Sequence, residues 1–516
     1  MPFELVREYM TIDQEVSTFN TQTSLEELIK IPDYKPNMRN VLFVKGVANI
    51  TSQSLEENIL NVEGEADYKV YYIAEGGYLE CTQVLVPYDY SMELKNLKGD
   101  INCILKSNFE HIDYRITNSR KINIRSILHI EGRVVKKNHF PILTDVKELK
   151  NIEKLQDKII ITKSAIKNKE RISITDAFVT EESDETSLKY IDASVRLAEL
   201  KSSKSPSGVL LSGKAEIQAL YAVEYEEKKE YKHIEEVVNF THFIEKTDID
   251  NIDNYFFQPS ITYQKFDFST DEIKQQIVLN AEIIVDTNII LYENIQIENI
   301  QDLYSPMVET EIEKEEVQAY YVVEDFGESI SVSDEIIISA DYPLEQILVV
   351  DMGVVVTDIM RQGKYIQVQG IVESTVIVKI ASEIDVLEKF QKEIPFTYNV
   401  HTSTENNQIA DFSVALQGGN VTQRGNSIMI SQDVLVKGNL YQSIKLNMIQ
   451  AITEVEVQDQ LEIGEYYSIK AYYKQPGDSL WDIAKTNSTT IDKILKDNYI
   501  EGVENIADYT PLVIIK

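Results

Sequence analysis

Residues 64–72 read GEADYKVYY, residues 213–221 read GKAEIQALY and residues 370–378 read GIVESTVIV. Each stretch begins with a glycine and places a small, apolar or aromatic side chain two, six and eight positions later. Side chains at even spacing lie on one face of a β-strand. The three stretches therefore predict three equivalent strands, each with one buried face.

The neighbours of these strands repeat in the same order. An aromatic residue follows each glycine by 24 to 27 positions and stands two places after a β-branched residue, in Val86-Pro87-Tyr88, Val238-Asn239-Phe240 and Ile394-Pro395-Phe396. A third landmark keeps one spacing in all copies: Ile124, Leu128, Ile130 and Gly132; Ile273, Ile277, Leu279 and Ala281; Ile430, Val434, Val436 and Gly438. Three ordered landmarks in three copies predict a triplicated domain.

The repeated segments are rich in Ile, Val, Tyr and Thr with alternating polarity, which favours strands over helices. The chain is therefore predicted to be mainly β, with three tandem β-sandwich or barrel-like repeats. The expected ranges are an N-terminal segment at 1–24 and repeats at 25–150, 165–300 and 320–455. The charged stretches 147–163 and 309–316 separate the repeats and fit exposed strands or short helices equally well. The glycine that opens each stretch is interpreted as a requirement of the fold.

The periodicity becomes helical after about residue 466. Leu480, Ile483 and Ala484 have helical spacing, and so do Ile491, Ile494 and Leu495. Asp478 and Thr489 are the expected N-caps of these two helices. Strand-like residues 469–473 and 512–515 flank them. The range 466–516 is therefore predicted to be a small βααβ domain.

Trp481 lies one position off the apolar stripe of the first predicted helix. That offset is about 100° around a helix, so the ring is expected to be partly exposed at the edge of the packed face. Two interpretations remain open for it. The ring either completes the core of the module or anchors an interface, because tryptophan is enriched among interface hot spots.

The run Tyr473-Lys-Gln-Pro-Gly-Asp-Ser-Leu-Trp-Asp-Ile-Ala484, followed by Asn498 and Pro511-Leu-Val-Ile514, resembles the LysM domain family. This family usually has Gly-Gln before its last strand, where this chain has Tyr509-Thr510 after an extra stretch at 499–505. The departure falls on one lip of the family's glycan groove, so protein binding and glycan binding both stay open. The residues predicted to bind a partner are Gly477, Asp478, Ser479, Leu480, Trp481, Ile483, Asn498 and Tyr509.

Three β repeats followed by one LysM domain resemble the SipL-like spore coat morphogenetic proteins of clostridia, whose repeated module is the SPOCS domain. The resemblance implies a non-enzymatic scaffold that assembles the spore coat around the forespore, in the mother cell. It implies docking to the basement-layer ATPase of the coat, stage IV sporulation protein A, through the LysM domain. Other coat proteins and a second copy of the chain are further expected partners.

Composition narrows the function classes. The net charge of −35 repels phosphate backbones and anionic lipids, so no nucleic acid is expected as a partner. Residues 464–516 carry only −2 of this charge. We expect neither a transmembrane segment nor a secretory signal, and the two cysteines, Cys81 and Cys103, suit a cytoplasmic protein with free thiols.

Catalytic and cofactor motifs are missing from the sequence. It contains no phosphate-binding glycine loop, no Gly-x-Ser-x-Gly motif and no histidine pair at metal-ligand spacing. We therefore predict no catalytic residue, no cofactor and no metal. The main alternative is a wall-associated protein that binds the N-acetylglucosamine chains of peptidoglycan. A phage-tail component with a LysM domain is a third candidate.

Overall fold

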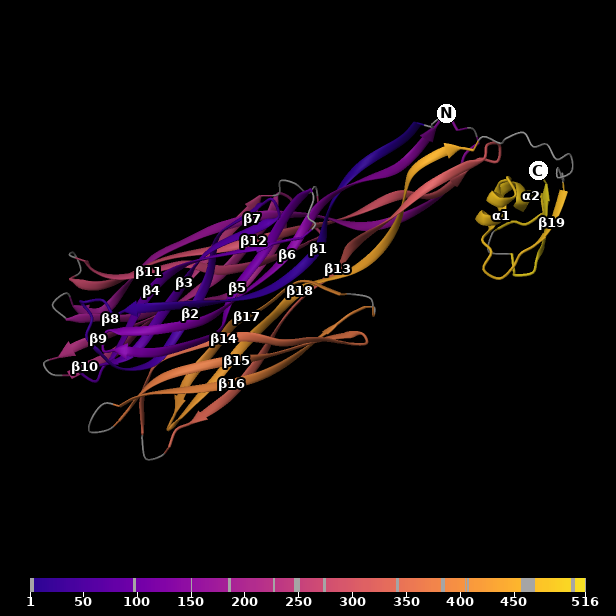
Figure 1. The fold of residues 1–516 in the computed structure, drawn as a ribbon. Helices are drawn as coiled ribbons and strands as arrows, with labels where there is room; N and C mark the ends of the chain where they lie inside the picture. Colours follow the sequence, from indigo (N-terminus) through magenta and orange to yellow (C-terminus); the bar gives the residue numbers. More distant parts are fainter. Residues whose placement is uncertain are drawn as a thin grey trace.

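The structure is a computed structural model of the 516-residue chain. It describes residues 4–515 except 96–98, 150, 184–186, 226–227, 246–250, 272–274, 340–342, 382–385, 404, 406–407, 456–468 and 503–505. The described residues form an elongated body of eighteen long strands, followed by a small helical module at the C-terminus (Figure 1). The prediction of a mainly β chain with a βααβ end is confirmed.

Each repeat consists of six strands. The first contains β1 (Glu4–Lys30), β2 (Met38–Glu56), β3 (Ile59–Ala74), β4 (Leu79–Glu93), β5 (Asp100–Asn118) and β6 (Lys121–Lys147). The second contains β7 (Glu153–Ser183), β8 (Leu188–Ser205), β9 (Gly208–Tyr225), β10 (Lys228–Glu245), β11 (Asn254–Asp271) and β12 (Gln276–Tyr304). The third contains β13 (Thr310–Ile337), β14 (Leu344–Gln362), β15 (Tyr365–Ile380), β16 (Val386–His401), β17 (Gln408–Arg424) and β18 (Ser427–Glu454).

The six strands of each repeat form two antiparallel three-stranded sheets. In the first repeat the strand orders are β1-β6-β5 and β2-β3-β4, and the same orders recur as β7-β12-β11 with β8-β9-β10 and as β13-β18-β17 with β14-β15-β16. The inner faces of the two sheets pack on each other. In the third repeat, Val372 and Val376 of one sheet share a core with Ile430 and Val434 of the other. Each repeat is thus a β-sandwich.

The first two sequence landmarks are neighbours across adjacent strands. Gly370 pairs with Phe396, and a Cβ on the glycine would lie 2.4 Å from a ring atom of that phenylalanine. In the same way, Gly64 lies under the ring of Tyr88, and Gly213 lies under the ring of Phe240. The missing side chain makes room for the aromatic ring, so the glycine and the aromatic residue must occur together. The interpretation of these glycines as a fold requirement is confirmed.

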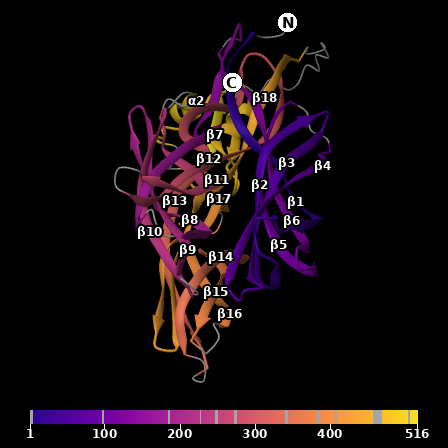
Figure 2. The same cartoon turned by 90° about the vertical axis from the view of Figure 1, so that its left-hand side faces the viewer.

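The repeats share cores with one another as well. The outer halves of the first and last strands of each repeat run together toward the end of the molecule that holds the N-terminus (Figure 1). There Leu143 of β6, Leu303 of β12 and Ile452 of β18 belong to one buried cluster. The middle sheets meet elsewhere, where Tyr71, Ile191 and other side chains from all three repeats form a second shared cluster. The three repeats therefore pack into one body and are not separate domains along the chain (Figure 2).

The stretches predicted as connections are mostly strand. Residues 153–163 belong to β7 and residues 310–316 to β13, so these charged segments are strands and not helices. From Glu4 onward the N-terminal segment lies in β1, which pairs with β6. Cys81 and Cys103 are free and buried. Ile273, part of the third landmark, lies outside the described residues.

The C-terminal module contains β19 (Ile469–Tyr473), α1 (Leu480–Thr486), α2 (Ile491–Asp497) and β20 (Pro511–Ile515), and its two strands pair antiparallel. Both predicted N-caps are wrong by one residue. Ser479 caps α1, because the carboxylate of Asp478 is taken up by other donors. Thr490 caps α2, because the Thr489 amide still bonds to Ala484 in the last turn of α1.

Candidate functional site

Gly477, Asp478 and Ser479 build the turn that leads from β19 into α1. Gly477 has a φ of 90°, a conformation that glycine adopts without strain. Asp478 accepts hydrogen bonds from the amide of Gln475 and the hydroxyl of Tyr472, both at 2.8 Å, and these bonds lower the pKa of its carboxyl group. The Ser479 hydroxyl accepts from the amide of the third helix residue. This turn is held by hydrogen bonds and is partly exposed at the surface of the module.

Three other predicted residues act inside the module. Leu480 and Ile483 are buried in its core with Leu512 and Ile514 of β20. Asn498 joins the end of α2 to β20, because its amide nitrogen donates to the Val513 carbonyl at 2.7 Å and its oxygen accepts from the Val513 amide at 2.7 Å. These side chains fix the shape of the module and offer little surface to a partner.

Tyr509 occupies the position where the LysM family usually has glycine. Its φ is 67°, in the left-handed region that favours glycine, and the tyrosine side chain is 66% exposed. Tyr473 and Tyr499 are also exposed. Tyr509 therefore keeps the backbone turn and adds an aromatic side chain to the surface.

Trp481 is buried, which makes the prediction of a partly exposed ring wrong. It is 7% exposed because the second repeat covers it. Its ring meets that of Tyr304 edge to face with the centroids 4.9 Å apart, and its indole nitrogen donates to Asp302 at 2.8 Å. Of the two interpretations, the interface anchor fits this contact, and the interface lies within the chain. The core interpretation fits as well, since Trp481 also packs with Leu480 and its neighbours.

Comparison with protein families matches residues 37–117 to the SipL SPOCS domain and residues 475–513 to the LysM domain. The chain carries a SPOCS domain and a LysM domain. The SPOCS match covers β2 to β5 of the first repeat, and the second and third repeats have the same strand order. No curated protein and no solved structure matches the chain.

These two domains define the general class of the protein. The SipL domain marks it as sporulation-associated, and a LysM domain is of a type that can bind peptidoglycan. Both are binding domains rather than catalytic ones. Helices α1 and α2 have seven residues each, and the described part of the chain holds no helix that could span a bilayer.

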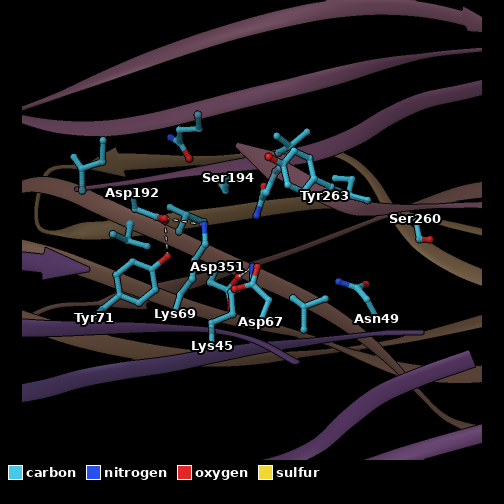
Figure 3. A pocket seen from close by; sticks show the side chains of 18 of the residues that line it. Lys45, Asn49, Asp67, Lys69, Tyr71, Asp192, Ser194, Ser260, Tyr263 and Asp351 are labelled. Atoms are coloured by element: carbon cyan, nitrogen blue, oxygen red, sulfur yellow. Dashed lines mark hydrogen bonds and ion pairs between the residues drawn. The ribbon is translucent and has the colours of Figure 1, made fainter. Parts of the chain in front are cut away.

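A cavity of about 380 Å³ lies where the SPOCS repeat meets the other two repeats. Figure 3 shows that Lys69, Tyr71 and Asp192 come together on one side of it. The Lys69 ammonium donates to Asp192 at 2.7 Å, and the Tyr71 hydroxyl donates to the same carboxylate at 2.6 Å. A second ion pair joins Lys45 to Asp351 of the third repeat.

The charges at this cavity serve the contact between repeats. Burial alone would lower the pKa of Lys69, but the facing Asp192 carboxylate raises it, so the lysine stays charged. Each of the two lysines is neutralised by an aspartate from another repeat. Neither is left free to hold an anionic ligand. Breaking the buried Lys69–Asp192 pair would cost about 3–5 kcal/mol, because the remaining charge would be left uncompensated.

Asp302 and Tyr304 are functional candidates that the sequence analysis missed. Both lie at the end of β12, far from the LysM domain in sequence, and no repeat landmark includes them. An aspartate and a tyrosine at the end of a strand form no motif and no periodic pattern that would have drawn attention to them. Asp302 and Tyr304 come into contact with α1 only when the chain folds.

Proposed function

We propose that the protein is a non-enzymatic scaffold for spore coat assembly around the forespore. In this proposal it docks through its LysM domain to stage IV sporulation protein A, the basement-layer ATPase of the coat. The supporting observation is the presence of a SipL SPOCS domain and a C-terminal LysM domain in one chain. The protein would act in the cytoplasm of the mother cell, at the forespore surface.

The LysM domain has surface properties that suit docking to a protein. It carries only −2 of the net charge of −35, so it repels an acidic partner far less than the repeats do. Tyr473, Tyr499 and Tyr509 are exposed on it, and tyrosine is enriched at protein interfaces. Among the eight predicted partner-binding residues, Gly477, Ser479 and Tyr509 would make direct contacts in the docked arrangement. Asp478, Leu480, Ile483 and Asn498 would hold the module in shape, and Trp481 lies on the face that meets the second repeat.

The test is a pull-down from lysate of sporulating cells that compares the full chain with residues 1–463. Recovery of the ATPase by the full chain alone would support the proposal. Equal recovery by both would move the contact to the β repeats and contradict it. Tyr509→Ala tests the proposed surface within an intact module, and Lys496→Ala, an exposed substitution on α2, is its control.

Binding to peptidoglycan is the second candidate function, and the LysM match favours it. Sedimentation of the full chain with purified peptidoglycan measures it directly. A chain that sediments with peptidoglycan and captures no coat protein would be a wall-associated N-acetylglucosamine binder. Tyr509 would then line the glycan site, and Tyr509→Gly, which restores the usual family residue, should strengthen sedimentation.

A further inference from the structure

The LysM domain rests on the end of β12 through a small set of buried polar and aromatic contacts. The Asp302 carboxylate accepts from the Trp481 indole at 2.8 Å and from the Lys485 ammonium at 2.7 and 2.8 Å. The Tyr304 hydroxyl donates to the Thr489 carbonyl at 2.8 Å, next to its ring contact with Trp481. We call Asp302 and Tyr304 the β12 receptor, and Trp481 with Lys485 the docking face.

The Asp302 carboxylate stays ionised in this contact. Burial would raise the pKa of Asp302, but hydrogen bonds from Lys485, Trp481 and Lys314 and the charge of Lys485 lower it below its ordinary value. Lys314 of β13 lies 3.2 Å from the same carboxylate. Charge-assisted hydrogen bonds are stronger than neutral ones, so Asp302 is the centre of the contact.

The β12 receptor lies beside the core that the three repeats share. Strands β6, β12 and β18 have similar lengths of 27, 29 and 28 residues. Val146, Leu303 and Ile452 belong to one buried cluster and lie one or two residues before the ends of these strands. Asp302 and Tyr304 flank Leu303, and Tyr304 is 4% exposed under the LysM domain. What distinguishes β12 here is therefore its side chains and not its length.

The contact has the make-up of a reversible interface. Among the described residues, the repeat side contributes one carboxylate and one aromatic ring. Apart from Tyr304, the cluster that contains Leu480, Ile483 and Leu512 lies within the LysM domain. The contact can therefore open without unfolding either part. This differs from the cores shared by the repeats, where aliphatic side chains from three repeats complete one another.

We propose that the LysM domain alternates between a state docked on the β12 receptor and a released state. Docking hides the face that carries Trp481 and Lys485. The released face fits a protein that offers the same chemistry as the receptor, a carboxylate beside an aromatic ring. Only the identity of such a partner rests on the proposed function; the docking equilibrium is independent of it.

Tryptophan fluorescence of the full chain tests the docking, because Trp481 is the only tryptophan among the 516 residues. In the wild-type protein we expect blue-shifted emission and weak quenching by acrylamide. Asp302→Asn keeps the shape of the side chain and removes its charge, so emission should shift to the red and quenching should increase. Lys485→Met, which removes the charged partner of Asp302 on the LysM domain, should also shift the emission to the red and increase quenching.

Asp157→Asn is the matched control. Asp157 is an exposed aspartate on β7, next to β12, and it accepts a hydrogen bond from Gln301. Its loss should change neither emission nor quenching. Far-UV circular dichroism of each variant checks that the β body is folded. Unchanged fluorescence in both Asp302→Asn and Lys485→Met would overturn the proposal.

Titration of the ATPase separates the docking from the proposed function. If the released state is roughly a tenth of the population, opening it should tighten the apparent affinity about tenfold in Asp302→Asn. Equal affinity of the wild type and an opened variant would overturn the claim that docking hides a binding face. If no variant binds the ATPase, the proposed partner is wrong, and the fluorescence result still decides whether the module docks.

Discussion

The ends of the last strands of the three repeats share one core but carry different side chains beside it. In β6, β12 and β18, an apolar residue one or two positions before the end of the strand belongs to the same buried cluster. In β12 this residue is Leu303, and its neighbours Asp302 and Tyr304 contact the LysM domain. Near the end of β6, Asp145 pairs instead with Lys154 of β7. The contact with the LysM domain therefore depends on the side chains beside the shared core and not on a longer strand.

The largest expected effect is a substitution that unfolds the LysM domain and leaves the β body folded. Leu480→Ala should destabilise the module by about 2–5 kcal/mol, because it opens a cavity in a small core. A module of about 50 residues has little stability to lose, so it should unfold at room temperature. Trp481 fluorescence reports the module, and far-UV circular dichroism reports the body. Ile469→Ala, at a 63% exposed position, is the control.

A change in the circular dichroism melting curve of Leu480→Ala as large as its change in fluorescence would contradict this separation. It would mean that the body depends on the LysM domain for its own stability. The same outcome would remove the basis for a module that docks and releases.

Within the repeats, Gly370→Ala should destabilise the body by about 1–3 kcal/mol, because overpacked cores shift or strain their neighbours. The new Cβ would lie 2.4 Å from the Phe396 ring and 2.6 Å from the Val355 carbonyl oxygen. Gly353→Ala on β14 is the matched control, since no atom lies within 4 Å of its Cβ position. Thermal unfolding should show a lower midpoint for the first variant only. Similar midpoints would show that the glycine–aromatic pair is not required.

Acid should weaken the contact between β12 and the LysM domain. Docking lowers the pKa of Asp302, so the stabilisation is complete above the ordinary aspartate value of about 3.9 and is lost as the pH falls through the lowered pKa. The groups that face Asp302 are Lys485 and Lys314, and burial raises the pKa of nearby Glu153. Acrylamide quenching of Trp481 should therefore rise below about pH 4.

Asp302→Asn is the control for this acid step, because the amide does not titrate. Its quenching should be high and nearly constant over the pH range in which the far-UV spectrum shows a folded body. An acid step of equal size in the variant would assign the titration to another group.

The smallest expected effect is that of Tyr304→Phe. This change removes the hydroxyl that donates to the Thr489 carbonyl and leaves the ring contact with Trp481 in place. One neutral hydrogen bond contributes about 0.5–1.5 kcal/mol, so quenching should increase less than in Asp302→Asn. If Tyr304→Phe released Trp481 as fully as Asp302→Asn, the hydroxyl rather than the carboxylate would be the centre of the receptor.

The features within each repeat were predictable from sequence because they depend on local periodicity. The glycine stretches at 64–72 and 370–378 placed β3 and β15, and the glycine and aromatic landmarks proved to be cross-strand partners. The helices of the LysM domain followed from apolar spacing in the same way. Their caps were missed by one residue, because neighbouring polar side chains compete for the same amides.

Contacts between distant segments could not be read from the sequence. Trp481 was expected to be partly exposed because only its own helix was visible, and its cover comes from Asp302 and Tyr304, almost 180 residues earlier. The clusters that join β6, β12 and β18 consist of ordinary Leu, Ile and Val residues. Nothing in their spacing distinguishes them from the residues inside one sandwich.

The cluster that joins β6, β12 and β18 also limits how early in synthesis the chain can fold. Leu143 and Leu303 are made well before Ile449 and Ile452, yet the four side chains belong to one core. During synthesis the early strands must wait with apolar side chains exposed until β18 has left the ribosome. Contacts between such distant segments form slowly, and uncovered strands are prone to aggregate. Nascent chains of this protein should therefore depend on chaperones until the third repeat is complete.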